Sequence, residues 1–268
     1  MIPELKLNSF VIIFLIIIII FILLNFVNDS MKNKVVVYER FENNEIPKII
    51  IQTWKTKAIP DKYKEDYDSL RKYNPKYQFL FFNDPDIKYF LQSNYPEYYK
   101  IYNKLPIIIQ KIDFFRYVAV YHYGGFYFDL DMRCFMSLDK LLKYNCVFPI
   151  DLVLKKRCEN TNFVRKRFKN YCENDMTFMV GQYAFGARPR HPFIKKLITT
   201  IQDNIDQYLE DFKINGDTLQ YVYSTTGPDY VTDLYMEYDN KDDVHILDYP
   251  DGQHFGEYAV HNHYGTWK

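Results

Sequence analysis

Residues 107–131 read IIIQKIDFFRYVAVYHYGGFYFDLD, and this stretch decides the fold. Its first part, residues 107–123, is long and largely apolar, which predicts a helix that ends at Gly124-Gly125. Phe126-Tyr127-Phe128 then predicts a short buried strand that runs directly into Asp129. A buried helix is therefore expected to lead into a buried strand whose end carries a carboxylate.

Strand and helix patterns alternate along the rest of the chain. Four further runs have the apolar character of buried strands: Lys48–Gln52, Tyr77–Phe82, Val147–Ile150 and Val244–Leu247. Four further stretches have helical character: one around Tyr63–Tyr73, one beginning at Asp84-Pro85, one near Phe193–Leu209 and one after Pro228. The alternation predicts an α/β fold with parallel strands in a single domain.

Asp129 and Asp131 flank one residue at the end of the predicted strand. Alternate side chains of a strand share a face, so both carboxylates are expected to point the same way. Strand ends of open α/β sheets face the ligand crevice, where two oxygen ligands with open positions suit Mg²⁺ or Mn²⁺. Such a metal would stabilise the charge on a departing diphosphate. By itself, an Asp-x-Asp pair also occurs at solvated strand ends.

Asp113 and Arg116 lie three residues apart and share one face of the predicted helix. The simplest interpretation is an intrahelical ion pair that contributes about 0.3–0.5 kcal/mol. However, the helix is largely apolar, so the pair is expected to be buried. Because burying charges is costly, such pairs usually have a function.

The N-terminal region contains the run FVIIFLIIIIIFILL from Phe10 to Leu24. These fifteen apolar residues reach the lower limit of length for spanning a bilayer. No small-x-small cleavage site follows, which favours an uncleaved signal-anchor over a signal peptide. We expect a short tail at residues 1–9, a signal-anchor at 10–27, a polar stem at 28–45 and a catalytic domain at 46–268. The flanking charges do not choose an orientation.

Composition restricts the class of partner. Lys plus Arg and Asp plus Glu both number 34, and this balance lacks the basic character of a nucleic-acid-binding protein. The four cysteines, Cys134, Cys146, Cys158 and Cys172, match no zinc pattern. Four cysteines allow three pairings, which an oxidising compartment would permit, and the sequence does not choose between disulfides and free thiols.

Four segments together resemble glycosyltransferase family 32, the family with a sugar-binding Asp-x-Asp region. They are IPKIIIQTWK at 46–55, KIDFFRY at 111–117, YHYGGFYFDLD at 121–131 and HNHYGTW at 261–267. The resemblance implies a GT-A fold, a Mn²⁺ or Mg²⁺ cofactor, a nucleotide-sugar donor and retention of the anomeric configuration. Within that family, mannose transfer from GDP-mannose to glycans or inositol-phosphate sphingolipids is common, and UDP-sugars are alternative donors.

The resemblance also assigns roles in the donor site. Gln52-Thr53-Trp54 would border the base of the donor nucleotide. Asp113 and Arg116 would hold hydroxyl groups of the transferred sugar. Thr266-Trp267 would close over the diphosphate from a C-terminal flap, with Thr266 standing where the family usually has Ser.

The same resemblance assigns the metal site. Asp129 would face the ribose and the sugar, while Asp131 would hold most of the metal. The family's histidine corresponds to either His261 or His263, and His263 is our predicted third ligand. Gln182 either borders the acceptor or belongs to a simple strand-turn-helix junction.

The sequence therefore predicts a metal-dependent retaining glycosyltransferase that moves a hexose, mannose from GDP-mannose being favoured, to a glycan or glycolipid. A single-pass type II membrane protein facing the Golgi or ER lumen is expected from this function. Two alternatives remain. A haloacid-type phosphatase would use Asp129 and Asp131, but it requires Thr or Val two residues after the second Asp, where Arg133 stands. The second alternative is a catalytically inactive, membrane-anchored sugar-binding protein.

Overall fold

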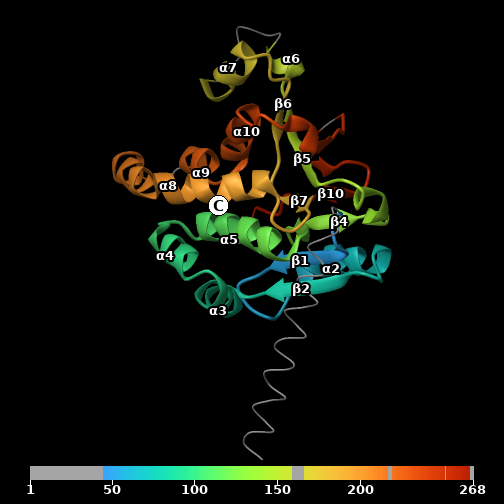
Figure 1. Ribbon diagram of the computed structural model, residues 1–268. Coiled ribbons are helices and arrows are strands. Elements are labelled where there is room, and N and C mark those ends of the chain that lie inside the picture. Colours follow the sequence, from blue (N-terminus) through green and yellow to red (C-terminus); the bar gives the residue numbers. More distant parts are fainter. Residues whose placement is uncertain (1–44, 159–165, 217–218, 251, 266–268) are drawn as a thin grey trace, which may run out of the picture. The chain divides into compact units, whose positions relative to one another are not determined.

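The computed structural model describes residues 45–158, 166–216, 219–250 and 252–265 (Figure 1). The predicted tail, signal-anchor and nearly all of the stem lie outside these residues, as do Thr266 and Trp267. Among the helices that are described, none is long and apolar enough to cross a bilayer. Residues from Glu45 onward cluster into one compact unit.

A mixed seven-stranded sheet organises this unit, in the order β2-β1-β3-β7-β5-β6 with β8 on β5. Its strands are β1 (Ile49–Thr53), β2 (Gln78–Phe82), β3 (Gly125–Phe128), β5 (Cys146–Val153), β6 (Phe178–Val180), β7 (Ala184–Ala187) and β8 (His245–Leu247). A second, antiparallel sheet has the order β4 (Met132–Cys134), β10 (Ala259–His261) and β9 (His254–Phe255).

The strand directions in the large sheet are mixed. β1 runs parallel to β2 and β3, and β5 runs parallel to β8, but β7 is antiparallel to both β3 and β5. β6 is also antiparallel to β5. The five strands that the sequence predicted, β1, β2, β3, β5 and β8, all run in the same direction. The sequence missed the antiparallel β6 and β7, which are short and lie in a stretch that contains Gly181 and Gly186. The overall class is mixed α/β.

Helices cover the sheet. They are α2 (Asp61–Tyr73), α3 (Asp84–Asn94), α4 (Pro96–Lys104), α5 (Ile108–Tyr123), α6 (Lys155–Cys158), α7 (Lys166–Glu173), α8 (Pro192–Asn215), α9 (Leu219–Thr225) and α10 (Pro228–Met236), with short 3₁₀ helices at Leu138–Leu141 and Lys241–Asp243. α5 and α8 pack side by side in the centre of Figure 1.

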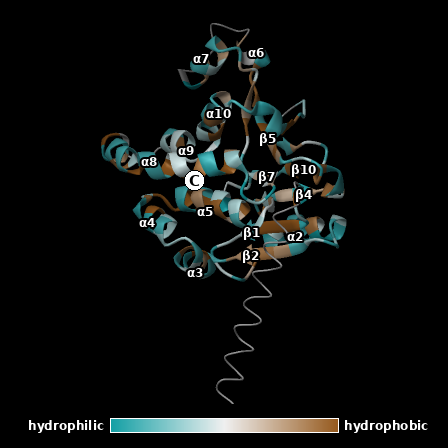
Figure 2. Cartoon of the chain, viewed as in Figure 1, coloured by the Kyte–Doolittle hydropathy of each residue, from teal (hydrophilic) through white to brown (hydrophobic). Residues whose placement is uncertain are grey.

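The strands are apolar on both faces because each face contributes to a separate core. Ile49 and Ile51 of β1 belong to the core formed with α3, α4, α5 and α8, whereas Ile50 belongs to the core beneath the small sheet. Alternate residues of a strand point to opposite faces, so a strand covered on both sides reads as a continuous apolar run. The brown colour of β1 and β2 in Figure 2 shows this character.

The turn between α5 and β3 needs two glycines. Gly124 and Gly125 have φ angles of +65° and +87°, a region that side-chain-bearing residues rarely adopt. A Cβ on Gly125 would also lie 2.4 Å from the carbonyl oxygen of Ile49. The glycines therefore let β3 start directly beside β1, which carries the end of β3 to the centre of the sheet.

One disulfide joins Cys158 at the end of α6 to Cys172 in α7. Cys134 and Cys146 are buried free thiols. The structure thus selects a pairing that the sequence left open. The bridge links the two helices on either side of residues 159–165.

Candidate active site

Asp129 and Asp131 lie in the turn between β3 and β4 rather than on the strand itself. The backbone N–H of Asp129 donates to the carbonyl of Tyr183 at 2.8 Å, and that of Met132 donates to the carbonyl of Asp129 at 3.3 Å. The expectation that strand alternation aligns the two carboxylates is therefore corrected. They converge because the turn folds the chain back toward the small sheet.

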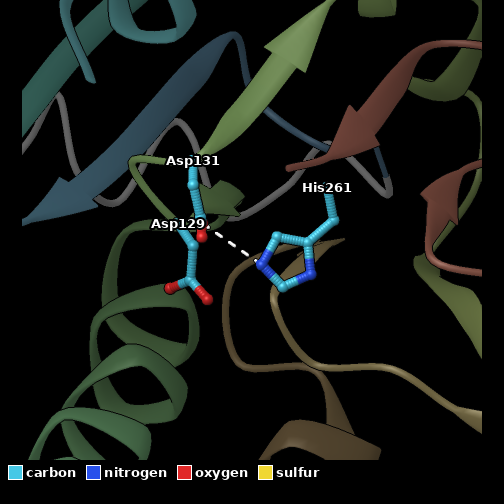
Figure 3. A group of neighbouring side chains, drawn as sticks. All are labelled: Asp129, Asp131 and His261. Atoms are coloured by element: carbon cyan, nitrogen blue, oxygen red, sulfur yellow. Dashed lines mark ion pairs between the residues drawn. The ribbon is translucent and has the colours of Figure 1, made fainter. Parts of the chain in front are cut away.

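His261 completes a cluster with these two aspartates (Figure 3). One ligand atom of each residue lies within 4.8 Å of the others, and His261 Nε2 is 3.2 Å from Asp131 Oδ1. β10 places the histidine there by pairing antiparallel with β4, opposite Met132. Carboxylates suit Mn²⁺ and Mg²⁺, and an imidazole is a common further ligand of divalent transition metals. The residues present therefore fit a divalent metal.

Local contacts set the charge of this cluster. Burial raises the pKa of Asp131, but the hydrogen bond and charge of His261 outweigh burial and hold that pKa below its usual value. The backbone N–H of Tyr264 also donates to Asp131 Oδ2 at 3.1 Å. His263, the predicted ligand, has its ring centroid 3.8 Å from that of His261. His261 thus stands in the cluster, and the role of His263 stays a prediction.

Asp113 and Arg116 are buried in α5, as the apolar helix predicts, with side chains 1% and 3% exposed. Arg116 Nη2 lies 3.2 Å from Asp113 Oδ1 and 3.3 Å from Asp129 Oδ1. The guanidinium therefore joins the helix pair to the first aspartate of the turn. Burial raises the pKa of Asp113 to about 6, although Arg116 opposes this shift.

Three further side chains hold this network. Thr226 Oγ1 donates to Asp113 Oδ2 at 2.8 Å, and Gln182 Nε2 donates to Asp113 Oδ1 at 3.3 Å. The Tyr127 hydroxyl donates to Asp129 Oδ1 at 2.8 Å. Tyr127 was not predicted as a site residue, because an aromatic residue in a buried strand has no sequence feature that separates it from the core.

The predicted base-binding residues lie at and beyond the end of β1. Thr53 and Trp54 line the same cavity as the aspartates, and the Trp54 ring packs edge-on against Tyr63 at 5.0 Å. Gln52 is buried beside Arg71 and is not part of the cavity wall. The structure therefore brings Thr53 and Trp54 together with the Asp cluster but places Gln52 behind it.

A cavity of about 490 Å³ connects these groups. Asp113, Arg116, Asp129 and Asp131 form part of its wall, and Ile108, Ile109 and Ile112 of α5 supply an apolar part. The volume falls within the range of small-molecule sites. An acidic pair with a nearby imidazole, a buried arginine and an aromatic rim is suited to a charged, hydroxyl-rich ligand.

Residues 60–148 match the family described as "Glycosyltransferase sugar-binding region containing DXD motif". The chain belongs to this glycosyltransferase family. The matched residues include α5, β3 and the Asp129–Asp131 turn. This membership contradicts the haloacid-phosphatase alternative.

Curated relatives of this glycosyltransferase are mostly longer. Inositol phosphoceramide mannosyltransferase 2 of Schizosaccharomyces pombe is 30% identical over 193 residues, which cover 72% of this chain and 47% of the relative. Mannosyl phosphorylinositol ceramide synthase SUR1 of Saccharomyces cerevisiae is 30% identical, covering 72% and 42%. The chain spans about half the length of the curated relatives it matches. Among solved structures, "PaToxG Glycosyltransferase" is 16% identical with a TM-score of 0.46, covering 79% of each chain.

Proposed function

We propose that this protein is a metal-dependent, retaining glycosyltransferase of GT-A fold that transfers mannose from GDP-mannose to inositol phosphoceramide or a related glycan. The observation that carries the proposal is the linked Asp113–Arg116–Asp129 network beside the Asp129–Asp131–His261 cluster. The similarity to inositol phosphoceramide mannosyltransferases supports the choice of sugar and acceptor.

In this proposal, Asp131, Asp129 and His261 hold Mn²⁺ or Mg²⁺. The ring centroid of His263 lies 3.8 Å from that of His261. When bound, the metal supplies Lewis-acid stabilisation of the nucleoside diphosphate that leaves. Asp113 and Arg116 orient the hydroxyl groups of the sugar, which fits their burial and fixed geometry.

Trp54 contacts the base of the donor in the same proposal. Its ring borders the cavity next to Thr53, whose hydroxyl lies 3.2 Å from that of Tyr127. Thr266 and Trp267, outside the described residues, are proposed to close over the diphosphate. The apolar stretch at residues 10–27 is proposed as the membrane anchor.

We also propose that the catalytic domain faces the lumen of the Golgi or ER as a type II membrane protein. The Cys158–Cys172 disulfide supports this placement, because disulfides persist in oxidising compartments and are rare in the cytosol.

The test is a screen of GDP- and UDP-sugars with the full-length protein, with Mn²⁺, with Mg²⁺ and with EDTA. We expect hydrolysis of GDP-mannose that requires the metal, and mannose transfer when inositol phosphoceramide is added. The Asp129→Ala/Asp131→Ala double variant should lose both activities, whereas a control double variant at the exposed Asp61 and Asp68 should retain them. Undiminished activity in the first variant would contradict the proposal, and turnover would exclude an inactive sugar-binding protein.

A further inference from the structure

The cavity extends beyond the residues that the donor site uses. Its wall also includes Asp151 of β5, Arg167 of α7 and Tyr223 of α9. The Asp151 side chain makes no hydrogen bond or ion pair with any other residue that the structure describes. Burial raises the pKa of Asp151 to about 6. The charges of His261 and Arg167 oppose this shift. A partly buried carboxylate without a hydrogen-bond partner is costly, so its position calls for an explanation.

The sheet places this carboxylate in the same cavity as the metal cluster. Phe126 of β3 and Val147 of β5 both pair with Gly186 of β7, and β3 and β5 run in the same direction. Asp129 follows three residues after Phe126, and Asp151 follows four residues after Val147. Both residues therefore follow the level of this pairing in the direction in which β3 and β5 run, and both line the cavity.

Arg167 provides a hydrogen-bond donor on the same side of the cavity. Its Nε donates to both carboxylate oxygens of Asp229, at 3.0 and 2.9 Å, and Gln220 donates to Asp229 at 2.9 Å. The Arg167 guanidinium also lies 4.4 Å from the centre of the Tyr223 ring. Its Nη1 group makes no hydrogen bond to any residue in the described ranges, and it remains available to a ligand.

The charges of this wall indicate the chemistry of its ligand. Asp151 and Asp229 carry two negative charges against one positive charge on Arg167, which disfavours a phosphate at Asp151. A hydroxyl group both donates and accepts hydrogen bonds, so it can use a free carboxylate and a free N–H together. The aromatic ring of Tyr223 adds an apolar face of the kind that borders a sugar or cyclitol ring.

We infer that Asp151 and Arg167 form the acceptor subsite, in which the Asp151 carboxylate accepts hydrogen bonds from hydroxyl groups of a polyol ring. This inference rests on the proposed glycosyltransferase function. It adds which side of the cavity binds the acceptor. The acceptor ring lies between β5, α7 and α9, and its hydroxyl group faces the sugar held by Asp113 and Arg116. Any phosphate of the acceptor lies outside this end of the cavity.

The test compares two reactions of the full-length Asp151→Asn variant. The first is metal-dependent hydrolysis of GDP-mannose, which needs only the donor site. The second is mannose transfer to inositol phosphoceramide in detergent micelles or to methyl α-mannoside. We expect kcat/KM for the acceptor to fall about 10- to 100-fold, as expected for losing a charge-assisted hydrogen bond. Donor hydrolysis should stay within about threefold of the wild-type rate.

Asp233→Asn is the matched control. Asp233 is also a partly buried carboxylate with a raised pKa, owing to burial, but it lies outside the cavity wall. This variant should transfer and hydrolyse like the wild type. Asp151→Ser is a second, smaller variant of the subsite and should behave like Asp151→Asn.

The outcomes separate the two proposals. If the wild type hydrolyses no GDP- or UDP-sugar, the proposed function fails and the inference with it. If the wild type hydrolyses donor while Asp151→Asn transfers normally, the acceptor subsite is wrong and the proposed function stands. If Asp151→Asn loses hydrolysis and transfer equally, with an unchanged unfolding midpoint, Asp151 belongs to the donor site and the acceptor subsite is wrong. A wild type that hydrolyses the donor but transfers mannose to neither acceptor would also overturn the acceptor subsite.

Discussion

Replacing Asp113 by Asn should change stability by an amount that depends on pH. Asp113 is 1% exposed, and its pKa of about 6 lies above the ordinary value of 3.8 because burial disfavours the charged form. Between these two values, the folded protein holds a proton that the unfolded chain has released. The ionised carboxylate therefore lowers stability above pH 6, and this cost disappears below pH 3.8.

The magnitude follows from the size of the shift. A shift of about two pKa units corresponds to about 3 kcal/mol, because one unit is about 1.4 kcal/mol. The Asn variant does not carry this cost at any pH. The contacts that the ionised carboxylate makes with Arg116 and Thr226 are already included in this shift, and the remaining difference between a neutral carboxyl group and an amide does not depend on pH. Relative to the wild type, the variant should therefore gain about 2–3 kcal/mol of unfolding free energy when the pH rises from 4 to 7.5.

Urea unfolding followed by circular dichroism at pH 4 and pH 7.5 measures this difference. Asp68→Asn, at an exposed position of α2, is the control and should show the same relative stability at both values. Transfer activity of Asp113→Asn should fall about 10- to 100-fold through loss of a charge-assisted hydrogen bond to the sugar. A stability difference that does not change with pH, or that favours the wild type more at pH 7.5, would refute the reasoning.

Three other predictions follow from the structure. His261→Ala should raise the Mn²⁺ concentration needed for half-maximal donor hydrolysis at least tenfold, without lowering the unfolding midpoint by more than a few degrees. An unchanged Mn²⁺ requirement would show that His261 is not a metal ligand. Replacing Cys158 and Cys172 by Ser should lower the free energy of unfolding by about 3 kcal/mol, measured in urea, because the bridge closes a loop with a sequence separation of 14. Gly125→Ala should destabilise by roughly 2 kcal/mol or more through its φ of +87° and contact with Ile49; a thermal midpoint equal to that of wild type would contradict this reading of the turn.

The sequence predicted the buried Asp113–Arg116 pair better than it predicted the sheet around that pair. The prediction of a buried Asp113–Arg116 pair depended on two charges in a long apolar helix, which is a local pattern. β6 was missed because it is only three residues long, and β7 because its four residues are mostly alanine and glycine. The antiparallel direction of both strands is set by their partners. Tyr127 had no signal in the sequence, because an aromatic residue in a buried strand is common in structural positions.

What the sequence determined by itself was local: α5, the glycines that end it, strand β3 and the Asp129–Asp131 pair, because each depends on residues adjacent in the chain. The tertiary structure decided which histidine reaches that pair, since His261 arrives on β10 from a distant part of the chain. It also decided that Asp151, from β5, shares a cavity with Asp113. Strand pairing and packing bring these distant residues together, and the spacing of the residues along the chain predicts neither.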